Sequence, residues 1–323
     1  MSRDPMRWLR HTLAGPAAHH PDGVFATQRC RFDQTWLLIR VFYAVSVSLL
    51  LRVLTRWNGW LEVEAFDPLW PLAWARDFAP GTVASLLVVL FVVGWLAVQL
   101  VPHRRLARLA FALGLFLVVA FDNSFGKIDH DRHLWVYVAL LLVALPEGRE
   151  TDLARSRVAR QKTLLVFAGA QALFLASYTL AGLWKVVGGF EQMAQGRIGL
   201  LSPEAFSYLT ADRLLQTGSD SVFGPLVIEH VALGWPLLLG GIYLELFSLF
   251  VLYRPALWRL WGLGIVGIHA GSVLILTVNS PWNCLLAMLL FVAAPTATYG
   301  WRDTLASLPP WISRRRRLGR GPG

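Results

Sequence analysis

Apolar residues along this chain fall into eight long runs separated by polar segments. A run of about 20 apolar residues is long enough for a helix to cross the roughly 30 Å hydrocarbon core of a bilayer. We therefore predict an all-α protein, a polytopic transmembrane bundle, with basic tails at 1–35 and 297–323 around a membrane domain at 36–296. The predicted spans lie near 36–53, 81–101, 106–122, 133–146, 163–187, 229–253, 257–278 and 283–296.

Basic residues gather on alternate loops, and this pattern predicts the orientation of the chain. With the N-terminus in the cytoplasm, the segments on that side hold 21 of the 30 Lys and Arg residues and the opposite side holds seven. The remaining two, Arg40 and Arg52, lie within the first span. Since cytoplasmic loops of membrane proteins are enriched in Lys and Arg, both termini are predicted to be cytoplasmic.

The composition agrees with a membrane protein and argues against a nucleic-acid-binding one. The chain is 55% hydrophobic and only 15% charged, with a mean hydropathy of +0.50. The sidedness of the loops accounts for the net charge of +10, and the cluster at Arg314–Arg317 suits anionic headgroups. The predicted partner is therefore the lipid bilayer, with no nucleic acid, and the predicted location is the bacterial inner membrane. The oligomeric state stays open.

Two long segments are predicted on the outer face. The first, 57–80, is rich in aromatic side chains that suit the headgroup layer, namely Trp60, Phe66, Trp70 and Trp74. The second, 187–228, contains Ser202-Pro203-Glu204, a signal that predicts a short amphipathic helix from there to about Gln216.

The fourth and eighth spans are short, so polar chain next to them is predicted to enter the membrane domain. Each has roughly 14 apolar residues, against the 20 or so that a span needs. For the fourth span the missing length falls in the polar stretch 122–133, and for the eighth it falls in 279–283. Irregular polar backbone at that depth is tolerated only when it is buried in protein or lines a wet cavity.

Ionisable side chains in or beside the predicted spans mark a candidate site. Lys185 closes the 163–187 run, His130 and His133 lie in the polar stretch, and His269 lies within the seventh span. Ionisable residues at membrane depth are costly and usually face the interior of a bundle. We therefore predict one shared cavity that opens outward.

Each of these residues also has an ordinary structural interpretation. Lys185 can extend to the headgroups, His269 can make a hydrogen bond between helices, and Glu245 in the sixth span can tie two helices together. The spacing of His130 and His133, flanked by Asp129 and Asp131, is compatible with a metal, but two histidines in a loop are a weak signal. No metal site is predicted.

Three stretches resemble the membrane region of the vitamin K-dependent gamma-carboxylase and its bacterial relatives, the HTTM family. The first is Tyr178-Thr-Leu-Ala-Gly-Leu-Trp-Lys185, similar to the family's Tyr-x-x-Ala-Gly-x-x-Lys segment. The second is His133-Leu-Trp-Val-Tyr137, which follows Lys127 and a polar turn. The third is Glu245 in one apolar helix and His269 in the next, followed by Ser280-Pro281-Trp282.

The resemblance implies an enzyme that uses a lipophilic quinol cofactor of the vitamin K or menaquinone type in the outward-facing cavity. Lys185 would be the base that deprotonates the hydroquinone, and His133 its hydrogen-bonding partner. The residues expected to bind the cofactor are His269, Trp184, Asn279, Trp282 and Tyr178. The carboxylase has a large lumenal domain with no counterpart in this sequence, so the resemblance covers the membrane chemistry only.

Two other classes of function remain open from the sequence. One is a non-catalytic module that binds or transports a small hydrophobic ligand. The other is an assembly subunit of a membrane redox complex, with the outer segments as its docking surface.

Overall fold

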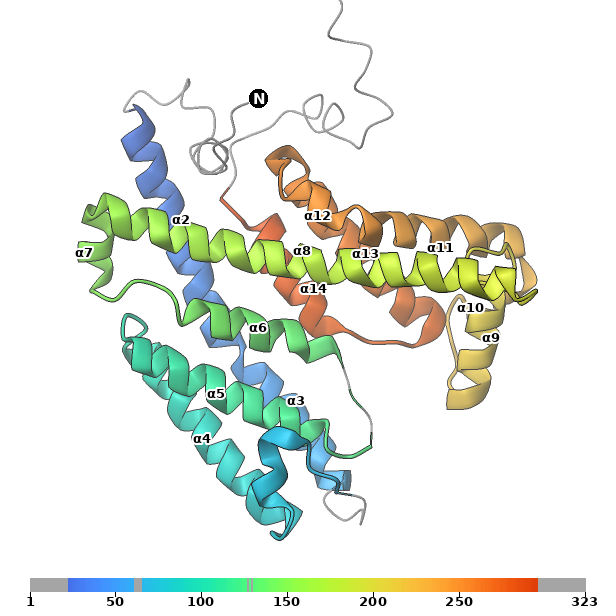
Figure 1. Ribbon diagram of the computed structural model, residues 1–323, viewed down its shortest axis with the longest axis horizontal. Coiled ribbons are helices and arrows are strands. Elements are labelled where there is room, and N and C mark those ends of the chain that lie inside the picture. Colours follow the sequence, from blue (N-terminus) through green and yellow to red (C-terminus); the bar gives the residue numbers. More distant parts are fainter. Residues whose placement is uncertain (1–22, 61–65, 127, 129, 296–323) are drawn as a thin grey trace, which may run out of the picture. The chain divides into compact units, whose positions relative to one another are not determined.

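The computed structural model describes residues 23–60, 66–126, 128 and 130–295, and it divides into two compact units (Figure 1). The first unit is Met1–Leu173 and the second is Phe174–Gly323, so the boundary falls inside the long helix α8 (Arg157–Ala194). Every described element is helical, which confirms the all-α prediction for this part of the chain. The two units are described separately.

Four stretches of the described chain are long and apolar enough to cross a membrane, judged by length and composition. They are Arg31–Leu51, Pro80–Leu100, Arg157–Ala194 and Pro255–Leu276, and the shorter helices Val231–Leu246 and Pro281–Val292 are also apolar. Apolar helices of this length reside in the lipid bilayer, as expected of a multi-pass membrane protein. Each of the eight predicted runs contains a helix, although four of them hold none that qualifies as a candidate span.

The first unit contains the chain from the basic N-terminal region to the first part of α8. Its elements are α2 (Gly23–Val45), α3 (Val47–Trp60), η2 (Trp70–Ala75), α4 (Pro80–Leu100), α5 (Arg105–Asp122), η3 (His130–Arg132), α6 (His133–Leu142) and α7 (Glu150–Arg155). Helix α2 begins inside the predicted tail 1–35, and α6 ends four residues before Pro146, where the fourth span was predicted to end.

Helices α4 and α5 lie side by side as a tight antiparallel pair in this unit (Figure 1). Two glycines allow the close approach: a Cβ at Gly94 would lie 2.8 Å from backbone atoms of Ala110, and a Cβ at Gly114 would lie 2.9 Å from Cα of Phe91. The aromatic core beside them includes Phe42, which stacks on Trp135 with the ring centres 4.7 Å apart. Small residues at a helix contact are typical of packing inside a membrane.

The segments predicted on the cytoplasmic side of this unit bond to one another. Buried Arg108 donates hydrogen bonds to the carbonyl oxygens of Pro102 (2.9 Å) and Leu145 (2.5 Å), and the amide of Arg105 donates to Glu147 (2.8 Å). Segments predicted on the outer side also meet, because the amide of Asp67 donates to the carbonyl of Ser124 at 2.9 Å. Each set of contacts joins loops to which the sequence assigns the same side.

The second unit contains the rest of α8 and the helices that follow it. These are α9 (Ala205–Thr217), α10 (Gly224–Glu229), α11 (Val231–Leu246), α12 (Ser248–Val251), η4 (Pro255–Leu257), α13 (Trp258–Leu276), α14 (Pro281–Ala287) and the π-helical turn η5 (Met288–Val292). The short helix predicted after Ser202 is present as α9. Helix α14 begins at Pro281, inside the polar segment 279–283 that was predicted to precede the eighth span, because proline is favoured in the first turn of a helix.

Candidate functional site

In the second unit, Lys185 of α8 forms an ion pair with Glu245 of α11. The Lys185 Nζ lies 2.5 Å from Oε1 and 2.7 Å from Oε2 of Glu245. The Glu245 side chain is 9% exposed, whereas that of Lys185 is 40% exposed. The ammonium group has three N–H donors and two face Glu245, so one remains for a ligand on the exposed side.

The pair forms because α8 and α11 approach closely one turn before the lysine. A Cβ at Gly182 would lie 2.5 Å from the backbone nitrogen of Leu246 and 2.9 Å from Cβ of Glu245, so only glycine fits there. Residues three apart on a helix lie on the same face, and Gly182 therefore brings Glu245 within reach of Lys185. Thr179 strengthens the contact, because its hydroxyl oxygen accepts the amide hydrogen of Leu249 at 2.8 Å, where α12 has broken away from α11.

A second polar pair joins α8 to α13. The hydroxyl of Tyr178 lies 2.6 Å from Nε2 of His269, and Tyr178 is buried. Tyr178 also stacks on Phe174, with the ring centres 4.8 Å apart. The interhelical hydrogen bond considered for His269 in the sequence is therefore present, with Tyr178 as the partner.

The two pairs lie on one face of α8. Tyr178 and Lys185 are seven residues apart, which is two helical turns and about 10 Å along the axis. A cation, a carboxylate, an imidazole and a phenol are thus gathered among apolar helices of one unit. This set of groups can bind an anionic ligand and exchange protons with it.

The depth that the sequence assigned to Lys185 and Glu245 needs correction. The apolar run 163–187 predicts that Lys185 lies near the outer end of the fifth span. Glu245 lies late in the run 229–253, which returns toward the cytoplasm, so the pattern predicts a deeper, cytoplasmic position for it. Helix α8 continues to Ala194, so Lys185 lies inside the helix, and it contacts Glu245 directly. A hydropathy pattern marks where the apolar run stops, and the polar turn from Gly188 onward can still be helical.

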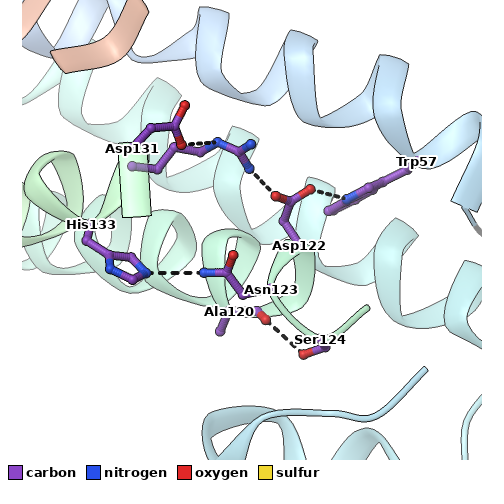
Figure 2. Close-up of polar contacts among 8 residues, drawn as sticks. Trp57, Ala120, Asp122, Asn123, Ser124, Asp131 and His133 are labelled. Atoms are coloured by element: carbon purple, nitrogen blue, oxygen red, sulfur yellow. Dashed lines mark hydrogen bonds and ion pairs between the residues drawn. The ribbon is translucent and has the colours of Figure 1, made fainter. Parts of the chain in front are cut away.

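The polar turn between α5 and α6 forms a separate network in the first unit (Figure 2). Asp122 forms an ion pair with Arg132 and accepts a hydrogen bond from the indole of Trp57 at 3.3 Å. The Nε of Arg132 also lies 3.3 Å from Oδ1 of Asp131. Asp122, Asp131 and Arg132 are all buried, so the predicted burial of this irregular polar stretch holds for its ends, whereas Ile128 and His130 are exposed.

His133 is the link between this network and the surface. Its Nε2 lies 3.2 Å from Nδ2 of buried Asn123, and its Nδ1 lies 3.3 Å from Nδ1 of His130, which is exposed (Figure 2 shows the Asn123 contact). Next to Asn123, the hydroxyl of Ser124 donates to the carbonyl of Ala120 at 2.8 Å. Both ring nitrogens of His133 therefore face polar side chains of its own unit.

The other predicted ligand-binding residues have different surroundings. Trp184 is 77% exposed, because neighbouring residues of a helix point in different directions, and it does not share the face of Lys185. Asn279 is exposed, and Trp282 is buried in the first turn of α14. Their role in binding a cofactor stays a prediction.

The predicted shared site of Lys185 and His133 also stays a prediction, because the two residues belong to different units. The quinol cofactor stays untested as well. Among the described residues, no group of three or more His, Cys, Asp or Glu side chains is arranged to hold a metal ion, and Asp129 lies outside that part of the chain.

Most of these polar residues stand out in the sequence, but the way in which they pair does not. The predicted spans place Lys185 and Glu245 at different depths, and the hydropathy pattern does not connect Asp122 with Arg132. One signal was available: opposite charges in neighbouring apolar helices usually neutralise each other. No sequence signal points to Trp57 as the donor to Asp122.

A comparison with known proteins supplies one relative. A curated protein of Synechococcus sp. (strain JA-2-3B'a(2-13)), named undecaprenyl-diphosphatase, is 29% identical over 226 aligned residues, which cover 62% of this chain and 75% of that protein. No protein-family model matches the chain, and no solved structure matches it.

This relative overturns the functional interpretation drawn from the gamma-carboxylase resemblance. The identification with the HTTM and carboxylase family is wrong, and so are the carboxylase or lyase activity and the quinol-dependent reaction inferred from it, because the similar protein is named as a phosphatase. Binding of a quinol as such stays untested. The two non-catalytic alternatives fall with it, since that name describes an enzyme. Packing explains part of the misleading motif: Gly182 admits α11, and Lys185 neutralises Glu245.

Proposed function

We propose that this protein hydrolyses a lipid diphosphate in the membrane and that the two polar pairs of the second unit carry the chemistry. The relative named undecaprenyl-diphosphatase supports this class of reaction and substrate. The observation that carries the assignment to a site is the ion pair of Lys185 and Glu245, in which the carboxylate is nearly buried and the ammonium is partly exposed. Such a pair presents a fixed cation to an anionic headgroup at the edge of apolar helices.

The reaction requires water, a place for negative charge and a route for one proton. Water attacks the terminal phosphorus, the bond between that phosphorus and the bridging oxygen breaks, and the products are inorganic phosphate and the lipid monophosphate. Negative charge on the transferring phosphoryl group needs a nearby cation, and the attacking water has to lose its proton.

The residues of the second unit fit these roles as follows. Lys185 uses its remaining N–H donor to bind a phosphate oxygen, while Glu245 holds the ammonium group in place. With Nε2–H of His269 donating to the Tyr178 oxygen, Nδ1 of His269 is left as the acceptor for the proton of water. Apolar helices around the site would take the lipid chain.

The test is phosphate release from undecaprenyl diphosphate in detergent micelles by the purified protein. We expect Lys185→Met to lower the rate by about 10²–10³-fold, because it removes the donor that stabilises phosphoryl charge. Glu245→Gln and His269→Gln should also lower the rate. Lys185→Arg keeps the charge but changes the geometry with Glu245, and a partial loss is expected.

Matched controls separate these losses from a general effect of substitution. Lys162→Met and Glu191→Gln remove exposed charges from the same helix, and both should keep the rate of the unsubstituted protein. Absence of phosphate release by the unsubstituted protein would exclude the proposed reaction. If the unsubstituted protein releases phosphate and both Lys185→Met and His269→Gln keep its full rate, the proposed site is excluded.

We also propose that the chain crosses the bacterial inner membrane eight times, with both termini in the cytoplasm. The distribution of Lys and Arg supports this, and so do the hydrogen bonds that join segments assigned to the same side. Reporter domains fused to each terminus should both read as cytoplasmic, and a periplasmic reading at either end would contradict the proposed topology.

A further inference from the structure

His130 and His133 lie side by side in the first unit and have no role in the proposed hydrolysis. Residues 130–132 form the 3₁₀ turn η3, and α6 begins at His133. A 3₁₀ turn has three residues per turn, so side chains at positions i and i+3 eclipse each other. This local geometry brings the two imidazoles to the same side of the chain.

The distance between the two Nδ1 atoms and the distance between the two ring centres both match those expected for two imidazoles bound to one tetrahedral metal ion. Two imidazole nitrogens that bind a metal at about 2.0–2.1 Å lie roughly 3.3–3.4 Å apart, and their ring centres lie about 5.2 Å apart. In this protein the Nδ1 atoms are 3.3 Å apart and the ring centres 5.1 Å apart. The ring planes are inclined by 76°, so the rings are not stacked on each other.

A direct hydrogen bond between the two rings accounts less well for the same distances. A linear N–H···N contact with this nitrogen separation would place the ring centres about 5.6 Å apart, and a nitrogen separation of 3.3 Å is long for a hydrogen bond. The ring centres are closer than a linear contact allows, and their separation of 5.1 Å agrees with two imidazoles that share one ion.

The surroundings support a cation at this point. A histidine that binds a metal through one nitrogen usually donates its other N–H to an oxygen, and Asn123 lies 3.2 Å from Nε2 of His133. With its amide oriented so that the oxygen faces the ring, Asn123 accepts that hydrogen. The adjacent buried groups are Asp122 and Asp131 against Arg132, so they add no net positive charge.

We propose that His130 and His133 form a binding site for a divalent transition-metal ion such as Zn²⁺, with both Nδ1 atoms as ligands. His130 is exposed, so the remaining coordination positions of the ion are open to water or to an anionic ligand. Imidazole nitrogen is a preferred ligand of Zn²⁺, Co²⁺, Ni²⁺ and Cu²⁺, and asparagine at the second nitrogen fixes the ring orientation. The site is independent of the proposed hydrolysis and lies in the other unit.

The experiment measures binding of Co²⁺ by its visible absorption, and of Zn²⁺ by competition, in full-length protein purified without a histidine tag. We expect one Co²⁺ ion per chain with a tetrahedral absorption band that Zn²⁺ abolishes. His130→Gln and His133→Gln should each lose the band. Asn123→Leu should keep the ligands and weaken binding by about 10–100-fold.

His230→Gln is the matched control, because His230 is an exposed histidine of the second unit. It should bind Co²⁺ as the unsubstituted protein does. A band that persists in His130→Gln, or one that His230→Gln removes equally, would overturn the proposed site. Since His130 is exposed, its substitution should leave the helical circular dichroism unchanged, which keeps the test valid if His133→Gln fails to fold.

Discussion

The two units of this protein each contain a buried carboxylate paired with a basic side chain, and the two pairs differ in how much water they reach. In the first unit, the side chains of Arg132 and Asp122 are 3% and 0% exposed. In the second unit, the side chains of Lys185 and Glu245 are 40% and 9% exposed. An ion pair between a carboxylate and a basic side chain therefore occurs once in an enclosed network and once with its cation partly exposed.

The difference in exposure separates structural pairs from pairs that can act on a ligand. A fully enclosed pair has lost the hydration of both ions, and its members satisfy each other with the help of Trp57 and Asp131. No ligand reaches Arg132 without breaking those contacts. Lys185 keeps a donor and an open side, and it is for this reason the better candidate for binding a phosphate.

The largest expected effect is from Arg132→Met, which removes one member of the enclosed pair. Asp122 would remain buried without its main partner, and the free energy of unfolding should fall by about 3–5 kcal/mol. Thermal unfolding in detergent, followed by circular dichroism, measures this loss. Arg76→Met, at an exposed position of the same unit, is the control and should change stability little. If the two variants were equally stable, burial of the Arg132–Asp122 pair would not contribute to stability. The proposed difference between this enclosed pair and the partly exposed pair of Lys185 and Glu245 would then be wrong.

A smaller effect is expected from Gly182→Ala, which tests how the open pair is held. The added methyl group would meet the backbone of Leu246, so α8 and α11 have to separate, at a cost of about 1–3 kcal/mol. Gly188 lies on the same helix and has no atom within 4 Å of an added Cβ.

Gly188→Ala is therefore the control and should be neutral or stabilise the helix by up to about 1 kcal/mol. Phosphate release should decline in Gly182→Ala and not in Gly188→Ala, since only the first displaces Glu245. If the two variants unfold at the same temperature, close approach at Gly182 does not position the pair.

The smallest expected effect is from Ser124→Ala in the enclosed network. Its hydroxyl accepts the amide hydrogen of Leu69 at 3.1 Å, and the substitution leaves that amide without this partner, at a cost of about 1 kcal/mol. Ser85→Ala removes an exposed hydroxyl from α4 and should change stability by less. A larger loss for Ser85→Ala would show that burial does not set the strength of these contacts.

Hydrophobic patterning predicted the helices well and their ends less well. Each of the eight apolar runs contains a helix, because a long apolar segment in lipid has to satisfy its backbone within itself. The end of α8 was missed by several residues, since Gly188–Ala194 is less apolar but continues the same backbone hydrogen bonding. The turn at 122–133 was expected to be buried in protein, and its two ends are, at 122–124 and at Asp131 and Arg132, whereas Ile128 and His130 between them are exposed.

The candidate residues were found one at a time, and their partners were not. Lys185, Tyr178 and His269 stand out in the sequence because polar groups are rare in apolar helices. That Lys185 contacts Glu245 depends on Gly182, 63 positions earlier in the chain than Glu245, and on the break between α11 and α12. The resemblance to carboxylases failed for a related reason: short motifs of small and polar residues serve helix packing as readily as catalysis.

The sequence by itself determined that this is a helical membrane protein and which of its side chains are too polar to face lipid. Both follow from the cost of unsatisfied polar groups in hydrocarbon, which acts on each segment locally. Only the tertiary structure decided which charge each polar group meets and how much water it keeps. The partner of a charge and its exposure to water are set where helices far apart in the sequence approach within a few ångströms, as α8 and α11 do at Gly182. The residue pattern of a single helix does not contain that information.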